Sequence, residues 1–114
     1  MISKKQLINK DIAVDIDGVL TLTTGLKDFF NSTVNQHAKE FFSMKPNVKN
    51  INYVNKLFKH NTIILFTTRN NAHLNLTKKW LKQNKVKYHH LIMDKPYYDL
   101  LIDDKAINDF EVLK

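Results

Sequence analysis

Apolar residues gather in four short stretches of the chain, and each stretch ends at polar or turn-forming residues. The first runs from Asp11 to Asp17 and stops at Gly18, and the second, residues 62–67, is almost continuously apolar. Residues 87–93 and 100–103 form two further stretches of strand length. Short runs rich in β-branched residues and bounded by turn residues are typical of buried β-strands. The pattern therefore predicts four strands, and the continuous second run predicts a strand covered on both faces.

Between the strands, apolar residues recur at the three- and four-residue spacing of a helix. Residues 47–60 show this spacing directly after Pro46, a residue that fits the first turn of a helix. A second helix is predicted from Asn70 or Asn71 to about Asn84, with apolar side chains on one side and lysines on the other. Helices thus follow the first and second strands.

Strands that alternate with helices predict an α/β fold built as one domain over residues 1–114. The expected architecture is a single open parallel sheet of at least four strands, Rossmann-like, with right-handed crossovers and helices on both faces. A closing helix is predicted over residues 105–113. The segment 23–45, which contains four phenylalanines, fits either an amphipathic helix or an inserted flap. In such sheets ligands bind beyond the carboxyl ends of the strands.

Composition and charge limit which metal ligands, partners and cellular location the chain is expected to have. The chain has a formal net charge of +7 and no cysteine, so oxygen and imidazole are the available ligands, which suits hard cations such as Mg²⁺. The positive charge fits a nucleic-acid partner, an anionic substrate or a lysine-rich surface. No apolar stretch approaches the ~20 residues of a membrane helix, and residues 1–10 do not form a signal peptide. The expected location is therefore the cytoplasm, without membrane association.

Three of the predicted strands end at polar residues, and the topology brings these ends to one edge of the sheet. They are Asp15 and Asp17 after the first strand, Thr67 and Arg69 after the second, and Asp103 and Asp104 after the fourth. Strand side chains alternate, so Asp15 and Asp17 point the same way and repel unless a cation or proton lies between them. Such a costly pair indicates function. The structural alternatives are a turn capped by aspartates beside Gly18 and a helix cap at Asp103-Asp104.

Four motifs at these positions carry a resemblance to a known family. The order Asp15-Ile-Asp-Gly-Val-Leu-Thr21 after an apolar strand resembles the first motif of the haloacid dehalogenase (HAD) superfamily of phosphohydrolases. Leu65-Phe-Thr67 followed by Thr68-Arg69 resembles the second motif of the superfamily. Lys95 in Met93-Asp-Lys-Pro96 is placed like its lysine motif, and Leu101-Ile-Asp-Asp104 resembles its acidic fourth motif. All four occur in the order typical of the superfamily. The compact chain is similar to the branch of small phosphatases that lack a sizeable cap domain.

The resemblance implies a catalytic role for each matching residue. Asp15 attacks the phosphorus and forms an aspartyl phosphate, while Asp17 protonates the leaving oxygen and then activates a water. Thr67 and Lys95 bind the phosphoryl oxygens as their charge redistributes. An acid at position 17 favours a hydrolase, because ion-pumping members of the superfamily typically have threonine there.

The resemblance also implies a Mg²⁺ site held by Asp15, the main-chain carbonyl of Asp17 and a carboxylate of the fourth motif. Asp104 is the first choice for that carboxylate. Asp103 is also expected to contribute, because Asn108 stands where the motif often has a further acid. The predicted substrate-binding residues are Gly18, Thr68 and Arg69. For Arg69 two interpretations stay open, a clamp on a second anionic group of the substrate and a cap of the following helix.

The substrate class is also a matter of resemblance. Similar small phosphatases with a run like Lys95-Pro-Tyr-Tyr-Asp99 occur in bacterial surface-polysaccharide pathways, so the leading substrate is a sugar phosphate or a related small phosphorylated metabolite. Capless members tend to act on large substrates or use a neighbouring subunit as a lid, which would require a homo-oligomer. Two alternatives stay open, a phosphatase for nucleic-acid ends and a HAD-fold binding protein without turnover. Tyr97 and Tyr98 fit either a place beside the pocket or packing in the core, and core packing is the favoured interpretation. The five histidines are interpreted as non-catalytic.

Overall fold

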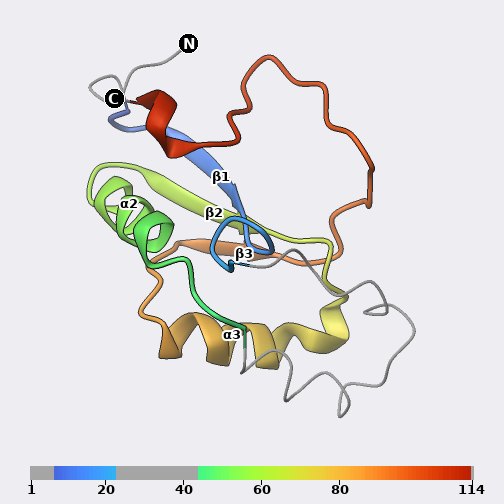
Figure 1. Ribbon diagram of the computed structural model, residues 1–114. Helices are drawn as coiled ribbons and strands as arrows, with labels where there is room; N and C mark the ends of the chain where they lie inside the picture. Colours follow the sequence, from blue (N-terminus) through green and yellow to red (C-terminus); the bar gives the residue numbers. More distant parts are fainter. Residues whose placement is uncertain (1–6, 23–43, 114) are drawn as a thin grey trace.

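The computed structural model describes residues 7–22 and 44–113, and the predicted helix or flap at 23–45 lies almost wholly outside these residues. In the described ranges the chain forms an open, parallel, three-stranded sheet in the order β1-β2-β3 (Figure 1). The strands are β1 (Asp11–Asp15), β2 (Thr62–Phe66) and β3 (His90–Ile92). The first three predicted strands are confirmed, although each is shorter than its apolar run.

Two α-helices follow the first two strands, as the apolar spacing predicts. Helix α2 (Val48–Phe58) begins at Asn47, whose side chain accepts a hydrogen bond from the main-chain N–H three positions on. The second helical segment begins at Asn70 with a 3₁₀ turn, η2 (Asn71–His73), and continues as α3 (Leu74–Gln83). Side-chain caps of this kind satisfy N–H groups that have no partner within the helix. No helix in the described ranges is long and apolar enough to cross a membrane.

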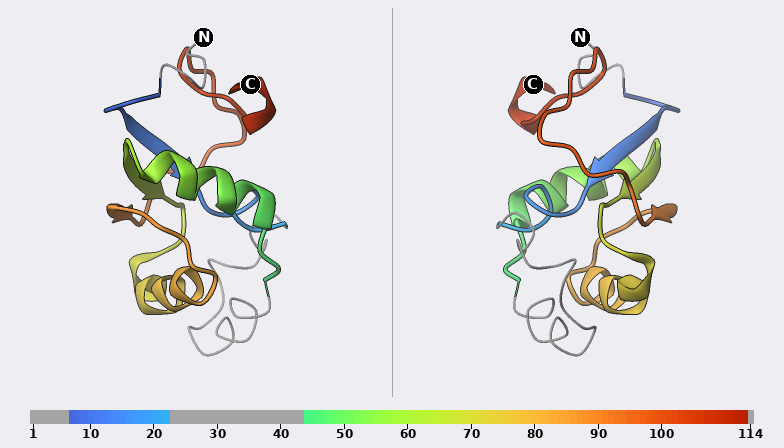
Figure 2. Two further views of the ribbon diagram at one scale, coloured as in Figure 1. Left: turned by 90° about the vertical axis from the view of Figure 1, so that its left-hand side faces the viewer. Right: turned by 90° about the vertical axis from the view of Figure 1, so that its right-hand side faces the viewer.

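Both α-helices cover the same face of the sheet, which Figure 2 shows from the side. In β2, Ile63 and Leu65 are buried while Ile64 and Phe66 are half-buried. The buried pair joins Val14 of β1 and residues of both helices in one core, which contains Ile51, Val54 and Leu57 of α2 and Trp80 and Leu81 of α3. A sheet in the order β1-β2-β3 with right-handed crossovers places consecutive helices on one side. Helices on both faces, and full burial of both faces of β2, are therefore wrong for the described residues.

The indole of Trp80 connects α3 to the segment before α2. Its Nε1 donates a hydrogen bond to the main-chain carbonyl of Met44 at 3.0 Å, and the ring is fully buried. A buried indole N–H needs such an acceptor, because an unpaired polar group in the core costs free energy. The contact fixes Met44 beside α3.

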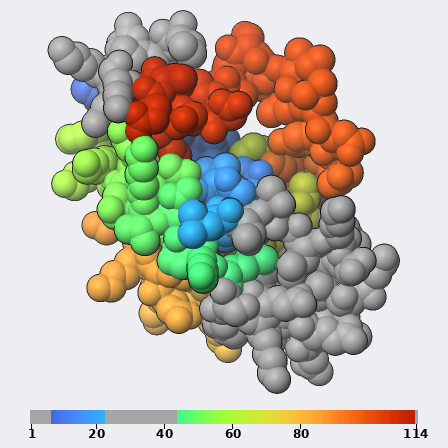
Figure 3. Space-filling view, in the orientation of Figure 1, coloured from blue at the N-terminus to red at the C-terminus, as the bar shows by residue number. Residues whose placement is uncertain are grey.

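Residues 93–109 form a long segment without helix or strand, which we call the outer loop; it is exposed except at Met93 and Lys95. Its apolar run 100–103 was predicted as the fourth strand, yet it has no strand conformation, and Ile102 is 89% exposed. The prediction of at least four strands is therefore wrong for the described residues. Figure 3 shows the outer loop, in orange, standing out from the rest of the described molecule.

Only the end of the predicted closing helix is helical. It forms a single 3₁₀ turn, η3 (Phe110–Leu113), which packs beside α2. The Phe110 ring stacks on Tyr53 at 5.3 Å between centroids, and Glu111 pairs with Lys49 at 2.6 Å. The chain therefore returns to the helix-covered face of the sheet after the outer loop.

Candidate active site

The carboxyl end of β1 carries two aspartates in a tight turn that is stabilised by hydrogen bonds within the turn itself. Asp15 is the last residue of the strand, and its Oδ1 accepts a hydrogen bond from the N–H of Ile16 at 2.8 Å. Gly18 has φ 84°, in the left-handed region that favours glycine, and its N–H donates to Thr21 Oγ1 at 3.0 Å. The turn thus fixes the main chain around Asp15 and Asp17. The predicted Gly18 has a structural role here, and its role in substrate binding stays a prediction.

The carboxyl ends of β2 and β3 are joined by main-chain hydrogen bonds. The N–H of Thr67 donates to the carbonyl of Ile92 at 3.0 Å, and the N–H of Lys95 donates back to the carbonyl of Thr67 at 2.8 Å. Asp94, with φ 60°, donates from its N–H to the carbonyl of Arg69 at 2.9 Å. These bonds hold the start of the outer loop against the loop after β2, and so place Lys95 beside the end of the sheet.

The side chain of Lys95 reaches the end of β1. Its Nζ lies 3.7 Å from Asp15 Oδ2, 4.0 Å from the centre of the Phe66 ring and 5.2 Å from the centre of the Tyr98 ring. The Lys95 side chain is 9% exposed, whereas that of Asp15 is 37% exposed and remains open to solvent. The structure therefore brings together Asp15 and Lys95, two predicted catalytic residues that are far apart in the sequence.

The environment of Asp15 changes the acidity of its carboxyl. Burial raises the pKa of Asp15 above its usual range, and the nearby charge of Asp17 adds to the rise. The Lys95 ammonium and the N–H of Ile16 favour the ionised carboxylate, so both lower the pKa of Asp15 and oppose the rise. The net direction is upward, so burial outweighs the ammonium group.

Asp17 is held by Arg69 in a two-pronged ion pair. Arg69 Nη2 lies 2.6 Å from Asp17 Oδ1, and Nε lies 2.9 Å from Oδ2. The Arg69 side chain is 1% exposed and that of Asp17 is 14% exposed. The structure thus places Arg69 against Asp17, whereas the sequence interpretation had it facing substrate or capping a helix. A signal for this pair existed in the sequence, because a second aspartate beside Asp15 requires a cation of its own.

Two other predicted residues of the loop after β2 lie close to this pair. Thr67 is fully buried, and its Oγ1 accepts a hydrogen bond from the N–H of Arg69 at 3.1 Å. Thr68 is half-buried. Both lie at the correct edge of the sheet, and phosphoryl binding by either residue stays a prediction.

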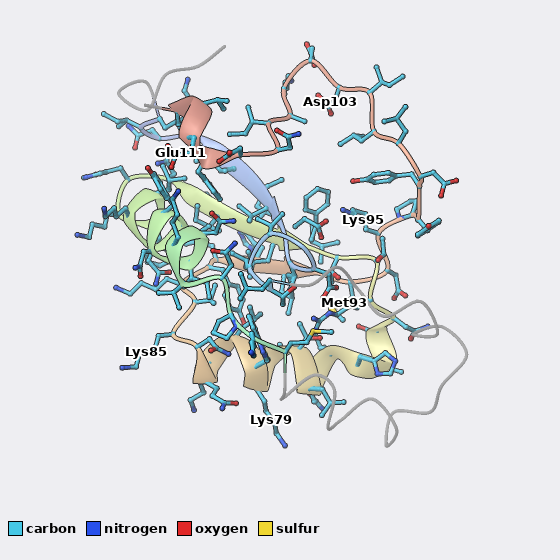
Figure 4. The ribbon with its side chains drawn as sticks, viewed as in Figure 1. Lys79, Lys85, Met93, Lys95, Asp103 and Glu111 are labelled. Atoms are coloured by element: carbon cyan, nitrogen blue, oxygen red, sulfur yellow. The ribbon has the colours of Figure 1, made fainter. Side chains whose placement is uncertain are left out.

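The predicted metal ligands do not come together. Asp103 and Asp104 lie in the outer loop, where both are exposed, and Asp103 Oδ1 accepts a hydrogen bond from the N–H of Lys105 at 2.6 Å. Figure 4 shows Asp103 at a part of the outer loop well away from Lys95. Within residues 7–22 and 44–113, no three acidic or histidine side chains gather as a metal site. The predicted site counts the main-chain carbonyl of Asp17 among its ligands, so the Mg²⁺ site stays a prediction.

Sequence reasoning identified the aromatic surroundings of Lys95 only in part. For Tyr97 and Tyr98 core packing was favoured over a place beside the pocket, yet both are exposed, and Tyr98 contacts the Lys95 ammonium. Phe66 was read only as part of an apolar strand. Its position one residue before Thr67 was the available signal, because the last side chain of a strand lies next to the ligand-binding edge.

Comparisons with known proteins show the fold. A crystal structure of an MCSG target from Vibrio cholerae superposes with a TM-score of 0.66 at 22% sequence identity, covering 86% of this chain and 82% of that one. A chain of the Pnkp1/Rnl/Hen1 complex superposes with a TM-score of 0.59 at 22% identity, covering 85% of this chain and 31% of that one. No protein-family model matches the chain, and no curated protein matches its sequence. The α/β fold is therefore shared with solved structures.

Proposed function

We propose that the protein is a phosphomonoester hydrolase that works through an aspartyl phosphate on Asp15, with a sugar phosphate or related small metabolite as substrate. The observation that supports this most is the contact of Asp15 Oδ2 with Lys95 Nζ, 3.7 Å apart at the carboxyl end of the sheet. A carboxylate nucleophile and an ammonium group at one strand end are the two charges that phosphoryl transfer requires. The four sequence motifs support the same reaction.

In the proposed reaction, Lys95 attracts the phosphoryl oxygens and Asp15 attacks the phosphorus. An Oδ–P bond forms as the bond from phosphorus to the ester oxygen breaks, and that oxygen takes a proton from Asp17. Water then attacks the aspartyl phosphate and gives a proton to Asp17, and inorganic phosphate leaves as Asp15 is restored. Phe66 and Tyr98 hold Lys95 without neutralising it, because aromatic faces carry no formal charge.

A requirement for Mg²⁺ is part of the proposal. Because the described residues do not gather the expected ligands, no step above depends on the metal. The requirement rests on the resemblance of the four motifs and is open to direct measurement with and without the ion.

The test is hydrolysis of a generic aryl phosphate by the wild type, Asp15→Asn and Asp11→Asn, each with Mg²⁺ and with EDTA. Asp11 is the matched control, because it begins the same strand and undergoes the same change of charge. We expect Asp15→Asn to lose at least about 10³-fold in kcat and Asp11→Asn to remain within about 3-fold of the wild type. Equal activity of the two variants would contradict the assignment of Asp15.

The second candidate is a phosphatase for nucleic-acid ends. One of the two superposed structures is a chain of the Pnkp1/Rnl/Hen1 complex. In addition, a groove of about 600 Å³ runs along β3 and α3 from Asp94, next to Lys95, and is lined in part by Lys78, Tyr88 and His90. Basic and aromatic side chains along a groove suit a nucleotide chain.

A comparison of substrates separates the two candidates. A kcat/KM for a phosphorylated oligonucleotide at least about 10-fold above that for sugar phosphates would favour the second candidate. The reverse order would favour the first. Binding of phosphate without turnover of any ester would leave the binding-protein alternative.

A further inference from the structure

The strongest polar contact in the described core is the ion pair between Arg69 and Asp17. Both Asp17 oxygens are used, at 2.6 Å from Nη2 and 2.9 Å from Nε. A guanidinium that meets a carboxylate through two parallel hydrogen bonds fixes its orientation as well as its charge. The Asp17 carboxylate therefore has one preferred position in this structure.

Arg69 also contacts two residues other than Asp17, which hold its guanidinium in place. Its Nη1 donates to Thr77 Oγ1 of α3 at 3.1 Å, and its Nη2 also lies 3.4 Å from the Met44 sulfur. All three guanidinium nitrogens of Arg69 therefore contact protein groups, and the side chain is 1% exposed. A substrate phosphate at the mouth of the site cannot reach a guanidinium buried in this way without displacing Asp17. This arrangement argues against a direct substrate contact.

The site thus has two separate pairs of opposite charge, Lys95 with Asp15 and Arg69 with Asp17. If Arg69 were absent, Asp17 would be left near Asp15 without a counter-ion and would be drawn to Lys95, the other cation at this edge of the described sheet. Lys95 would then be less available for phosphoryl oxygens. Arg69 prevents this competition by giving Asp17 a cation that substrate does not use.

We propose that Arg69 is a positioning residue, which acts on catalysis through Asp17 by keeping its carboxylate beside Asp15 and away from Lys95. This inference rests on the proposed function. During turnover one Asp17 oxygen has to leave Arg69 to carry the proton that passes to the leaving oxygen and is regained from the attacking water. The other oxygen stays on Arg69, and Thr77 holds the guanidinium in place. Arg69 is then needed for the rate of the chemical steps and has little effect on substrate binding.

The first test is a double-mutant cycle read by kinetics, with the wild type, Arg69→Gln, Asp17→Asn and the double variant. We expect Arg69→Gln to lower kcat by about 10–100-fold and to change KM by less than about 3-fold. In the Asp17→Asn background the same change should cost less than about 3-fold further, because its effect passes through Asp17. A KM raised about 10-fold with kcat kept would identify a substrate contact and overturn the proposal, as would equal losses in both backgrounds.

Two further variants separate positioning from simple loss of charge or of folding. Lys56→Gln removes one positive charge from the exposed side of α2 and should leave both kinetic constants unchanged. Thr77→Val removes only the hydrogen bond behind Arg69, keeps the size of the side chain, and should lower kcat by about 2–5-fold. If Thr77→Val folds normally and has the kcat of the wild type, the guanidinium does not need this support and the positioning role is overturned.

Urea unfolding of the same four proteins gives a readout that does not depend on activity. If Arg69→Gln lowers the urea midpoint less in the Asp17→Asn background than in the wild type, the two residues are coupled, which would support the ion pair. Additive midpoints would overturn the proposal whether or not hydrolysis is found. Coupled midpoints together with an inactive wild type would reject the proposed function, and with it the catalytic role of Arg69, while leaving the pair as a structural contact.

Discussion

Lys95 is held by aromatic rings on two sides while its ammonium contacts a carboxylate. The Nζ atom lies 4.0 Å from the Phe66 ring centre and 5.2 Å from that of Tyr98, distances at which a cation is attracted to the face of a ring. Phe66 belongs to the central strand, whereas Tyr98 is part of the outer loop. Tyr98 is therefore the member of the pair that can be changed without altering the core.

We predict that Tyr98→Leu weakens binding of inorganic phosphate by about 2–5-fold, because a cation–π contact at a partly exposed site is worth about 0.5–1 kcal/mol. Tyr98→Phe keeps the ring and should remain within about 2-fold of the wild type. Tyr97→Leu is the matched control, because it makes the same change at the neighbouring tyrosine of the outer loop, whose hydroxyl donates to Asp99. Competitive inhibition of hydrolysis by phosphate measures all three, and equal inhibition constants for Tyr98→Leu and Tyr98→Phe would contradict the prediction.

The raised pKa of Asp15 has a consequence for stability. The folded state binds the Asp15 proton more readily than the unfolded chain, mainly because the carboxyl is buried. Stability from this group is therefore present at low pH and is lost as the pH rises through the raised pKa. We predict that Asp15→Asn melts at a higher temperature than the wild type at pH 7, and that the difference shrinks toward pH 4.

Thermal melts of both proteins between pH 4 and pH 8 measure this difference. Asp11→Asn controls for the loss of one negative charge from the same strand. A melting temperature of Asp15→Asn below that of the wild type at pH 7 would show that the contact with Lys95 outweighs burial.

The sequence identified which residues meet at the site better than it identified what they contact. Asp15, Thr67 and Lys95 could be predicted, because strand ends of a parallel sheet share one edge and the motifs mark those ends. For the Arg69–Asp17 pair the sequence signalled only that Asp17 needs a cation, since the choice of Arg69 depends on side-chain directions in two loops that are distant in sequence. The position of Asp103 could not be predicted, because it depends on whether the chain after Lys95 returns to the sheet.

The helices could be predicted from their local sequence more reliably than the strands. Helix α2 and the segment from η2 to α3 were predicted correctly, because helical hydrogen bonds are local and the caps Asn47 and Asn70 mark where they begin. A strand needs a partner strand, and the run 100–103 has the composition of a strand without pairing to the described sheet. Apolar pattern alone cannot supply that partner.

A pair of isoleucine variants measures the difference between β2 and the outer loop. Ile63 is fully buried in β2 and Ile102 is 89% exposed. We predict that Ile63→Ala lowers the free energy of unfolding by about 2–5 kcal/mol. Ile102→Ala should change it by less than about 0.5 kcal/mol. Urea unfolding measures both, and a large loss for Ile102→Ala would show that the run 100–103 is packed in solution.

The outer loop also carries two of the predicted metal ligands, Asp103 and Asp104. If Asp104 binds Mg²⁺ together with Asp15, the loop has to approach the end of β1 when the ion binds. We predict that Mg²⁺ slows amide hydrogen exchange in residues 100–105 of the wild type by about 10-fold or more, and that EDTA reverses it. Asp104→Asn should abolish the effect. Unchanged exchange in the wild type would remove the outer loop from the metal site.

At the scale of the whole molecule, a basic body surrounds a site that contains two aspartates. The net charge is +7, and Lys78, Lys79 and Lys82 are exposed along α3. Figure 4 shows Lys79 directed away from the sheet. Such a surface attracts any polyanion, so binding of nucleic acid alone would not identify the substrate.

Salt dependence separates surface attraction from chemistry at the site. We predict that kcat/KM for a sugar phosphate falls by less than about 3-fold between 50 and 200 mM salt, because few charges are paired with so small a substrate. An oligonucleotide that follows the lysines of α3 should lose about 10-fold or more over the same range. Steady-state kinetics at a series of salt concentrations measures both, and a steep loss with the sugar phosphate would contradict the prediction.

The buried contact between Trp80 and Met44 gives the protein an internal optical signal. Trp80 is the chain's one tryptophan, and the sulfur of Met44, whose carbonyl it contacts, lies 3.4 Å from Arg69 Nη2. Indole emission depends on the polarity and packing around the ring, so the intrinsic fluorescence arises two contacts away from Arg69 and three from Asp17. A rearrangement of Arg69 when ligand binds would thus shift or quench the emission, without any attached dye.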